Sequence, residues 1–148
     1  MGKFIIPVIF LVIAVGAVVF RDRLSSNAAD LVAGDCFMVP ALETIEDVQH
    51  NPCTDPHDGE VLYTGDFEAG SVFPSDTQFD SWVQANCVDQ RFAEFVGASF
   101  QAREDIDLGY FTPTAEGWGE GDRQMICYLT PTTGEMGTSS FRAAPAAS

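Results

Sequence analysis

Four cysteines impose the strongest constraint on the fold of this 148-residue chain. All four, Cys36, Cys53, Cys87 and Cys127, lie in a part of the chain that is long enough for one small domain. An even set of cysteines in a small domain behind an export-type segment is typical of disulfides formed in an oxidising compartment. We therefore expect two disulfides, and a domain that lies outside the cytoplasm.

The export-type segment is the uninterrupted apolar run at residues 4–20. A helix of this length spans about 25 Å, the short end of what crosses a hydrocarbon core of about 30 Å, and Lys3 and the arginines within 21–23 can reach outward to the headgroups. A cleaved signal peptide is the alternative. The charges at 21–23 argue against it, because they separate the apolar run from the small residues Ser26 and Ala28 that would mark a cleavage site.

Composition divides the chain into four regions. These are a short N-terminus with a transmembrane signal anchor (1–23), a polar linker (24–33), an extracytoplasmic domain (34–142) and a low-complexity tail that we expect to be disordered (143–148). The expected location is the cell membrane, with a single pass and the C-terminal domain outside.

The region after residue 23 is strongly acidic. It contains four arginines, no lysine and 21 acidic residues, so its formal charge is −17. Such a field repels nucleic acid and anionic lipid headgroups, which leaves cationic, neutral or divalent partners. Acidity of this kind also keeps a domain soluble, whatever it binds.

Local pattern favours one of the three disulfide pairings. Residues 34–40 and 47–53 predict two strands of an antiparallel hairpin, which brings Cys36 opposite Cys53. Cys87 is then left to pair with Cys127. In the loop-entropy model each bridge is worth about 3 to 4 kcal/mol, and together they rival the net stability of a small domain.

A long helix is predicted after a third strand at residues 59–67. Ser75 with Gln78 forms a capping-box pattern, apolar residues then recur at three- and four-residue steps, and Gly97 is a C-cap candidate. We expect three aromatic residues of this helix to fill the core: Trp82, Phe92 and Phe95.

Two further strands are predicted at 106–114 and 124–132, joined by a glycine-rich turn with one exposed aromatic, Trp118. The predicted fold is therefore α+β, a small and mostly antiparallel sheet packed against one long helix.

Residues 51–63, NPCTDPHDGEVLY, hold the densest group of reactive side chains. Cys53 and His57 could ligate zinc with His50 or an acid, but a cysteine in a disulfide offers no thiolate. Calcium is the other metal alternative, through Asp55, Asp58 and Glu60, although these acids lack the ligand order of a known calcium loop.

The structural interpretation of this stretch is that its prolines and glycine set turns, and that His57 donates to a carbonyl or carboxylate and so fixes the loop before the third strand. A nucleophile elbow, a phosphate loop, a haem motif and a dinucleotide fingerprint are all absent from the sequence. We expect no catalytic residue, no metal and no cofactor; a small metal-dependent hydrolase centred on His57 is the alternative.

Several short motifs occur together in an ordered series. They are GDCF at 34–37, PC at 52–53, PHDGEV at 56–61, FP at 73–74, PT at 113–114, W-x-x-GDR at 118–123, Cys127 and SSFR at 139–142. This order resembles the septum-formation domain of actinobacterial membrane proteins. The resemblance implies an exported, membrane-tethered domain linked to cell division, and it supplies no catalytic residues; FPS in place of the family's FPG is a departure from its pattern.

The W-x-x-GDR motif raises a further hypothesis about the scarce cations. Arg123, next to Asp122, could pair with Asp58 or Glu60 and so tie the two motifs together, whereas a solvated arginine would contribute less than about 1 kcal/mol. The expected function is a non-catalytic interaction or scaffold domain with an envelope or division protein as partner. A ligand-binding sensor is the alternative, with an acidic cleft that takes a cationic peptide or glycan against Trp118.

Overall fold

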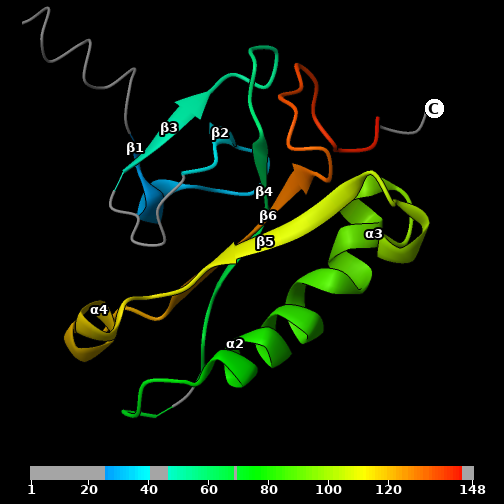
Figure 1. The fold of residues 1–148 in the computed structure, drawn as a ribbon. Coiled ribbons are helices and arrows are strands. Elements are labelled where there is room, and N and C mark those ends of the chain that lie inside the picture. Colours follow the sequence, from blue (N-terminus) through cyan, green and yellow to red (C-terminus); the bar gives the residue numbers. More distant parts are fainter. Residues whose placement is uncertain (1–25, 41–46, 69, 145–148) are drawn as a thin grey trace, which may run out of the picture.

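The computed structural model describes residues 26–40, 47–68 and 70–144. An antiparallel sheet has the strand order β1-β3-β2-β4-β6-β5, and helices cover one face of its β4, β6 and β5 part (Figure 1). The strands are β1 (Ser26–Asn27), β2 (Cys36–Met38), β3 (Asp47–Asn51), β4 (Gly59–Asp66), β5 (Ile106–Phe111) and β6 (Gln124–Pro131). The α+β class and the predicted hairpin are confirmed, with Cys36 opposite Asn51 in the β2–β3 register.

The predicted long helix begins and ends where the sequence indicates, but it is not continuous. Its parts are α2 (Asp76–Val83), a π-helical turn η2 (Gln84–Val88) and α3 (Gln90–Val96). Ser75 and Gln78 form the capping box, and Gly97 closes α3 with a φ of 82°. The π turn inserts one extra residue, so that the neighbours Cys87 and Val88 both face the core.

The core has two clusters, one on each face of the sheet. Side chains from the helices meet alternate residues of β4 and β6 in the larger cluster, where Phe92 is fully buried and Trp82 and Phe95 are partly buried. The smaller cluster lies on the other face around Phe37, Val61 and Ile126.

Both disulfides join the predicted partners. Cys36 is bonded to Cys53 and Cys87 to Cys127, which confirms the pairing. The second bond fixes the π turn of the helix to the middle of β6, and Tyr110 of β5 holds α2 through a hydrogen bond to Asp80. This hydrogen bond to a carboxylate raises the pKa of Tyr110 to about 12.

One prediction about the ends of the domain is wrong, and two others concern residues that the structure does not describe. Residues 26–31, assigned to the linker, belong to the folded unit, because β1 pairs with β3 and Leu31 is buried. No helix of the described residues is long and apolar enough to cross a membrane. The apolar run at 4–20 and the tail at 145–148 lie outside the described residues.

The predicted glycine-rich turn with an exposed aromatic is wrong. A short helix occupies it, α4 (Ala115–Glu120), capped by the Thr114 side chain and closed by Gly121 at a φ of 103°. Trp118 is buried, with its ring packed edge-on against Phe67 and Phe73 and its indole N–H donating to the carbonyl of Ser71. The tertiary contacts of one large aromatic ring override the weak helix propensity of the glycines.

Candidate functional site

The loop that precedes β4 is held by His57, as the structural interpretation predicted. Nδ1 of His57 lies 2.8 Å from the carbonyl oxygen of Asp55, and the His57 main chain forms a two-way bridge with Gly137. The side chain is only 2% exposed. His57 therefore links its own turn to a segment 80 residues further along the chain.

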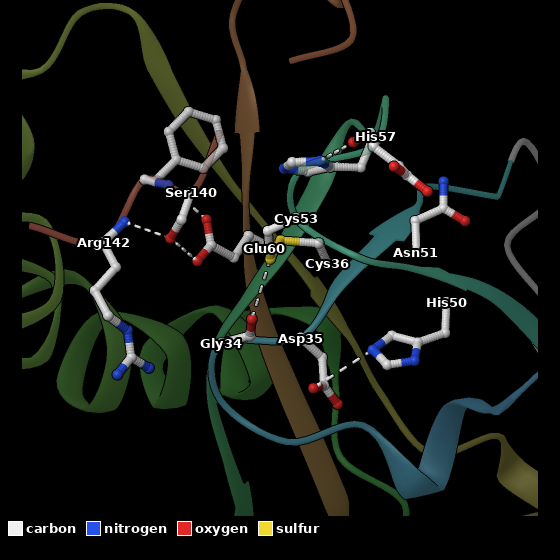
Figure 2. Close-up of a disulfide and its surroundings, with 12 residues drawn as sticks. Gly34, Asp35, Cys36, His50, Asn51, Cys53, His57, Glu60, Ser140 and Arg142 are labelled. Atoms are coloured by element: carbon white, nitrogen blue, oxygen red, sulfur yellow. Dashed lines mark hydrogen bonds and ion pairs between the residues drawn. A yellow bond between two sulfur atoms is a disulfide. The ribbon is translucent and has the colours of Figure 1, made fainter. Parts of the chain in front are cut away.

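Glu60 is the second buried polar residue and contacts the same C-terminal segment (Figure 2). Its carboxyl group accepts hydrogen bonds from the Ser140 hydroxyl at 2.5 Å and from the Phe141 main-chain N–H at 2.6 Å. Ser140 in turn accepts from the main-chain N–H of Arg142. A fully buried carboxyl group is thus supplied with donors, as burial requires.

Residues 137–143 form a segment that we call the C-terminal strap. Gly137 binds the His57 main chain, Ser140 and Phe141 bind Glu60, and the N–H of Ala143 donates to the carbonyl of Phe95 in α3. The strap thus joins the start of β4 to the end of the helix layer. Sequence patterns missed it, because its partners are remote in the chain and its own residues are small and polar.

The Cys36–Cys53 disulfide lies beside Glu60 (Figure 2). Potential ligand atoms of these three residues lie within 4.8 Å of one another, a spacing that could hold a metal ion if the sulfurs were thiolates. The sulfurs are bonded to each other, however, so they offer no thiolate. The zinc alternative loses Cys53 for this reason.

The hypothesis that Arg123 pairs with Asp58 or Glu60 is wrong. The Arg123 guanidinium stacks 3.6 Å above the Trp118 ring and donates to the carbonyls of Trp118 and Asp122. Asp58 accepts from the main-chain N–H of Val39 instead. In Figure 1, α4 lies far from the strap, at the other end of the β5–β6 pair, so the two motifs are not neighbours.

Asp122 shapes the turn after α4, where its carboxylate accepts from the main-chain N–H of Gln124. The predicted site residues therefore divide into two groups. His57, Asp58 and Glu60 fix the loop before β4, while Trp118, Asp122 and Arg123 fix the turn around α4.

The four arginines of the domain are all engaged within it. Arg91, Arg123 and Arg142 stack on aromatic rings, and Arg103 forms a two-pronged ion pair with Asp105. Within the described ranges this is the only arginine–carboxylate ion pair. Nearly all of the acidic charge is therefore left without a cation to neutralise it.

A groove of about 860 Å³ runs between β4 and the α2 and π-helical turns. Tyr63 and Trp82 form its aromatic part, with stacked rings 6.0 Å apart, and Asp66 and Glu68 provide exposed carboxylates. We call this feature the acidic groove. Its remaining lining residues are Phe67, Thr77, Gln78, Ser81, Ala85 and Asn86.

Trp118 was the aromatic residue expected to line an acidic cleft, but it is buried in the core. The aromatic residue that lines the groove beside acids is Trp82, which is partly buried near Asp66 of β4 and Glu68 of the loop after it. The sequence did contain a signal for this groove, namely an aromatic residue on the predicted helix together with acidic residues at the end of the preceding strand.

A family model described as septum formation matches residues 33–147. The chain belongs to the septum-formation family. No curated protein and no solved structure matches it. Membership links the chain to cell division or the cell envelope, and it confirms the resemblance that the ordered motifs indicated.

Proposed function

We propose that this septum-formation protein is a non-catalytic interaction or scaffold module that acts in cell division or envelope growth. The apolar run at 4–20 would anchor it in the membrane by a single pass, with the disulfide-linked domain on the extracytoplasmic side. Two disulfides and family membership support this assignment, because such bonds persist in oxidising compartments.

The acidic groove is the observation that carries the proposal. It combines the partly buried Trp82 ring, stacked on Tyr63, with exposed carboxylates, in a domain whose arginines are bound internally, Arg91 on Tyr63 itself. Aromatic rings attract guanidinium and ammonium groups through their faces, and nearby carboxylates add to that attraction. The partner that fits is a basic segment of another envelope or division protein.

The most reactive side chains are already engaged in hydrogen bonds or disulfides within the domain, which favours a binding function over a catalytic one. His57 and Glu60 are both buried and hydrogen-bonded to the loop or the strap, and the cysteines are consumed in disulfides. A metal-dependent hydrolase at His57 remains the alternative. Metal analysis of the purified oxidised protein distinguishes the two, since stoichiometric zinc would favour the enzyme.

A charge-matched comparison tests the groove. The groove variant is Asp66→Asn with Glu68→Gln, and the control variant is Asp30→Asn with Glu135→Gln, which removes two exposed carboxylates elsewhere. Both variants have the same net charge, so a non-specific effect of the acidic field is equal in the two. The probe is a short peptide that alternates arginine and glycine, titrated calorimetrically into the full chain at physiological salt.

We expect the groove variant to weaken binding by about 1 to 2 kcal/mol, close to tenfold, because two charge pairs are lost near aromatic surface. The control variant should bind like the unmodified chain. Equal weakening in both variants would show that the peptide responds only to the overall negative charge of the domain, and would refute a specific binding site in the groove.

Peptide mapping tests whether the domain lies in an oxidising, extracytoplasmic compartment. Protein taken from the native cell under non-reducing conditions should yield the Cys36–Cys53 and Cys87–Cys127 linked peptides. Recovery of the four cysteines as free thiols would remove the support for an extracytoplasmic domain.

A further inference from the structure

A second hollow lies against the C-terminal strap. It has a volume of about 390 Å³ and shares no lining residue with the acidic groove. Its walls are strap residues 139–143, the loop with Arg103 and Asp105, the end of α3 at Val96, and His57. We call it the strap pocket, and its size is suited to a small ligand.

One nitrogen of His57 has no partner among the described residues. Nδ1 lies beside the Asp55 carbonyl, which can only accept, so Nδ1 carries a hydrogen, and in the neutral ring Nε2 then presents a lone pair. His57 lines the strap pocket, and the described part has no fully buried side-chain nitrogen without a partner, so the unpartnered Nε2 keeps some exposure. Figure 2 shows this nitrogen on the side of the ring that faces Ser140.

The strap pocket is also unusually rich in cations for this domain. Arg103 and Arg142 line it, two of only four arginines after residue 23. Arg103 uses two of its five N–H donors on Asp105. Ser139 lies in the same wall and brings a hydroxyl group, whereas the hydroxyl hydrogen of Ser140 is already donated to Glu60. The Asp105 carboxylate is also in the wall, with both oxygens bonded to Arg103, so the pocket offers donors from two arginines and Ser139 and one isolated, nearly buried acceptor.

We propose that the strap pocket binds a small carboxylate that has an N–H or O–H donor next to the carboxyl group. The neighbouring donor bonds to Nε2 of His57, while the carboxyl oxygens accept from Arg103 and from the Ser139 hydroxyl. Two sources share this chemistry: the free carboxyl end of a peptide, and a free amino or hydroxy acid. A metal is disfavoured, because no cluster of three ligand residues in the described part includes His57.

The two histidines of the chain allow a direct test by nuclear magnetic resonance. The full chain is labelled with ¹⁵N at histidine, and the imidazole nitrogens are followed during titration with N-acetyl-alanyl-alanine. His50 is the internal reference, because its half-exposed ring lies beside Asp35 and does not line the pocket. We expect a saturable shift at Nε2 of His57, with a Kd on the order of 1 mM for a ligand of this size, and no change at His50.

Matched probes and variants identify the groups responsible. The C-terminal amide of the same dipeptide lacks the carboxylate and should bind about tenfold more weakly, and Arg103→Gln should weaken the acid form by a similar factor. Arg91→Gln, which removes an arginine stacked on Tyr63, is the control and should leave binding unchanged. Alanine and lactate distinguish a site for free acids from a site for the carboxyl end of a peptide. A site for free amino or hydroxy acids binds these two compounds as tightly as it binds the dipeptide.

Three results would overturn the proposal: no saturable shift at His57 with any of these acids, equal shifts at both histidines, or equal binding of the acid and the amide. Since the strap pocket and the acidic groove share no residue, failure here leaves the groove proposal standing, and the reverse holds as well.

Discussion

Replacement of Glu60 by alanine should release the C-terminal strap and destabilise the domain. The carboxyl group is fully buried and accepts two hydrogen bonds, from the Ser140 hydroxyl and the Phe141 main-chain N–H. A hydrogen bond to a charged group contributes about 1.5 kcal/mol or more, so the loss of both costs about 3 kcal/mol. Glu120→Ala, which removes an exposed carboxylate, is the control and should stay within about 0.5 kcal/mol of the unmodified chain.

Urea unfolding with the disulfides intact measures the effect, and it is followed by the emission of the two tryptophans, Trp82 and the buried Trp118. With an m-value of about 1.5 kcal/mol/M, a loss of about 3 kcal/mol lowers the unfolding midpoint by about 2 M. Ser140→Ala removes only one of the two bonds and should show about half of this shift.

A second observable separates strap release from general destabilisation. Trypsin cleaves after Arg142, and this bond lies in the strap, which Glu60 holds through Ser140 and Phe141. Under native conditions we expect cleavage after Arg142 to become faster in Glu60→Ala than in Glu120→Ala. Equal midpoints and equal cleavage rates in the two variants would refute the role assigned to Glu60.

Two further predictions concern the sheet. Tyr110→Phe should lower the free energy of unfolding by about 1 kcal/mol at neutral pH, because the hydrogen bond to Asp80 is lost. Because the pKa of Tyr110 is raised to about 12, this contribution is complete below about pH 10 and disappears as the pH rises through about 12. Unfolding free energies of the two proteins across that pH range test this, and a difference that persists unchanged above pH 12 would contradict it. Gly59→Ala should lower the stability measured by thermal unfolding by about 1 to 3 kcal/mol, because the added Cβ would lie 2.7 Å from the Phe37 ring. In the control Gly119→Ala the added Cβ meets nothing within 4 Å, so this variant should be neutral or stabilising. Equal melting temperatures for the two variants would contradict the packing argument.

Local patterns were sufficient for strands β2 to β6, the hairpin and the disulfides, but not for β1. A hairpin fixes which residues lie opposite one another, so Cys36 had one nearby partner and the other two cysteines had to pair. The helix limits also follow from local chemistry, since the cap at Ser75 and the glycine at 97 act within one turn.

The interruption of the helix had a sequence signal that a simple periodicity misses. Buried positions follow at steps of four through Phe79, Val83 and Cys87, and steps of four resume from Val88. The adjacent pair of buried residues marks the single inserted residue of a π turn. Two consecutive apolar residues between two regular series were therefore the evidence for it.

The strap and the burial of Trp118 could not be predicted in this way. Glu60 meets residues 80 and 81 positions away, and no local pattern specifies such a contact. Trp118 lies among glycines, which favour a turn by propensity alone, and its burial depends on aromatic partners in another loop. Charge scarcity suggested that Arg123 is tied down, but not that an aromatic face would hold it.

Photo-crosslinking from the acidic groove in the native cell tests whether the groove binds a basic envelope or division protein. A photoreactive amino acid is placed at Ser81, which is exposed in the groove, or at Glu94, which is exposed on α3 outside it. We predict that Ser81 crosslinks to one basic envelope or division protein, and that the product disappears when Asp66 and Glu68 are neutralised. Equal products from Ser81 and Glu94, or a product that survives neutralisation, would contradict the claim.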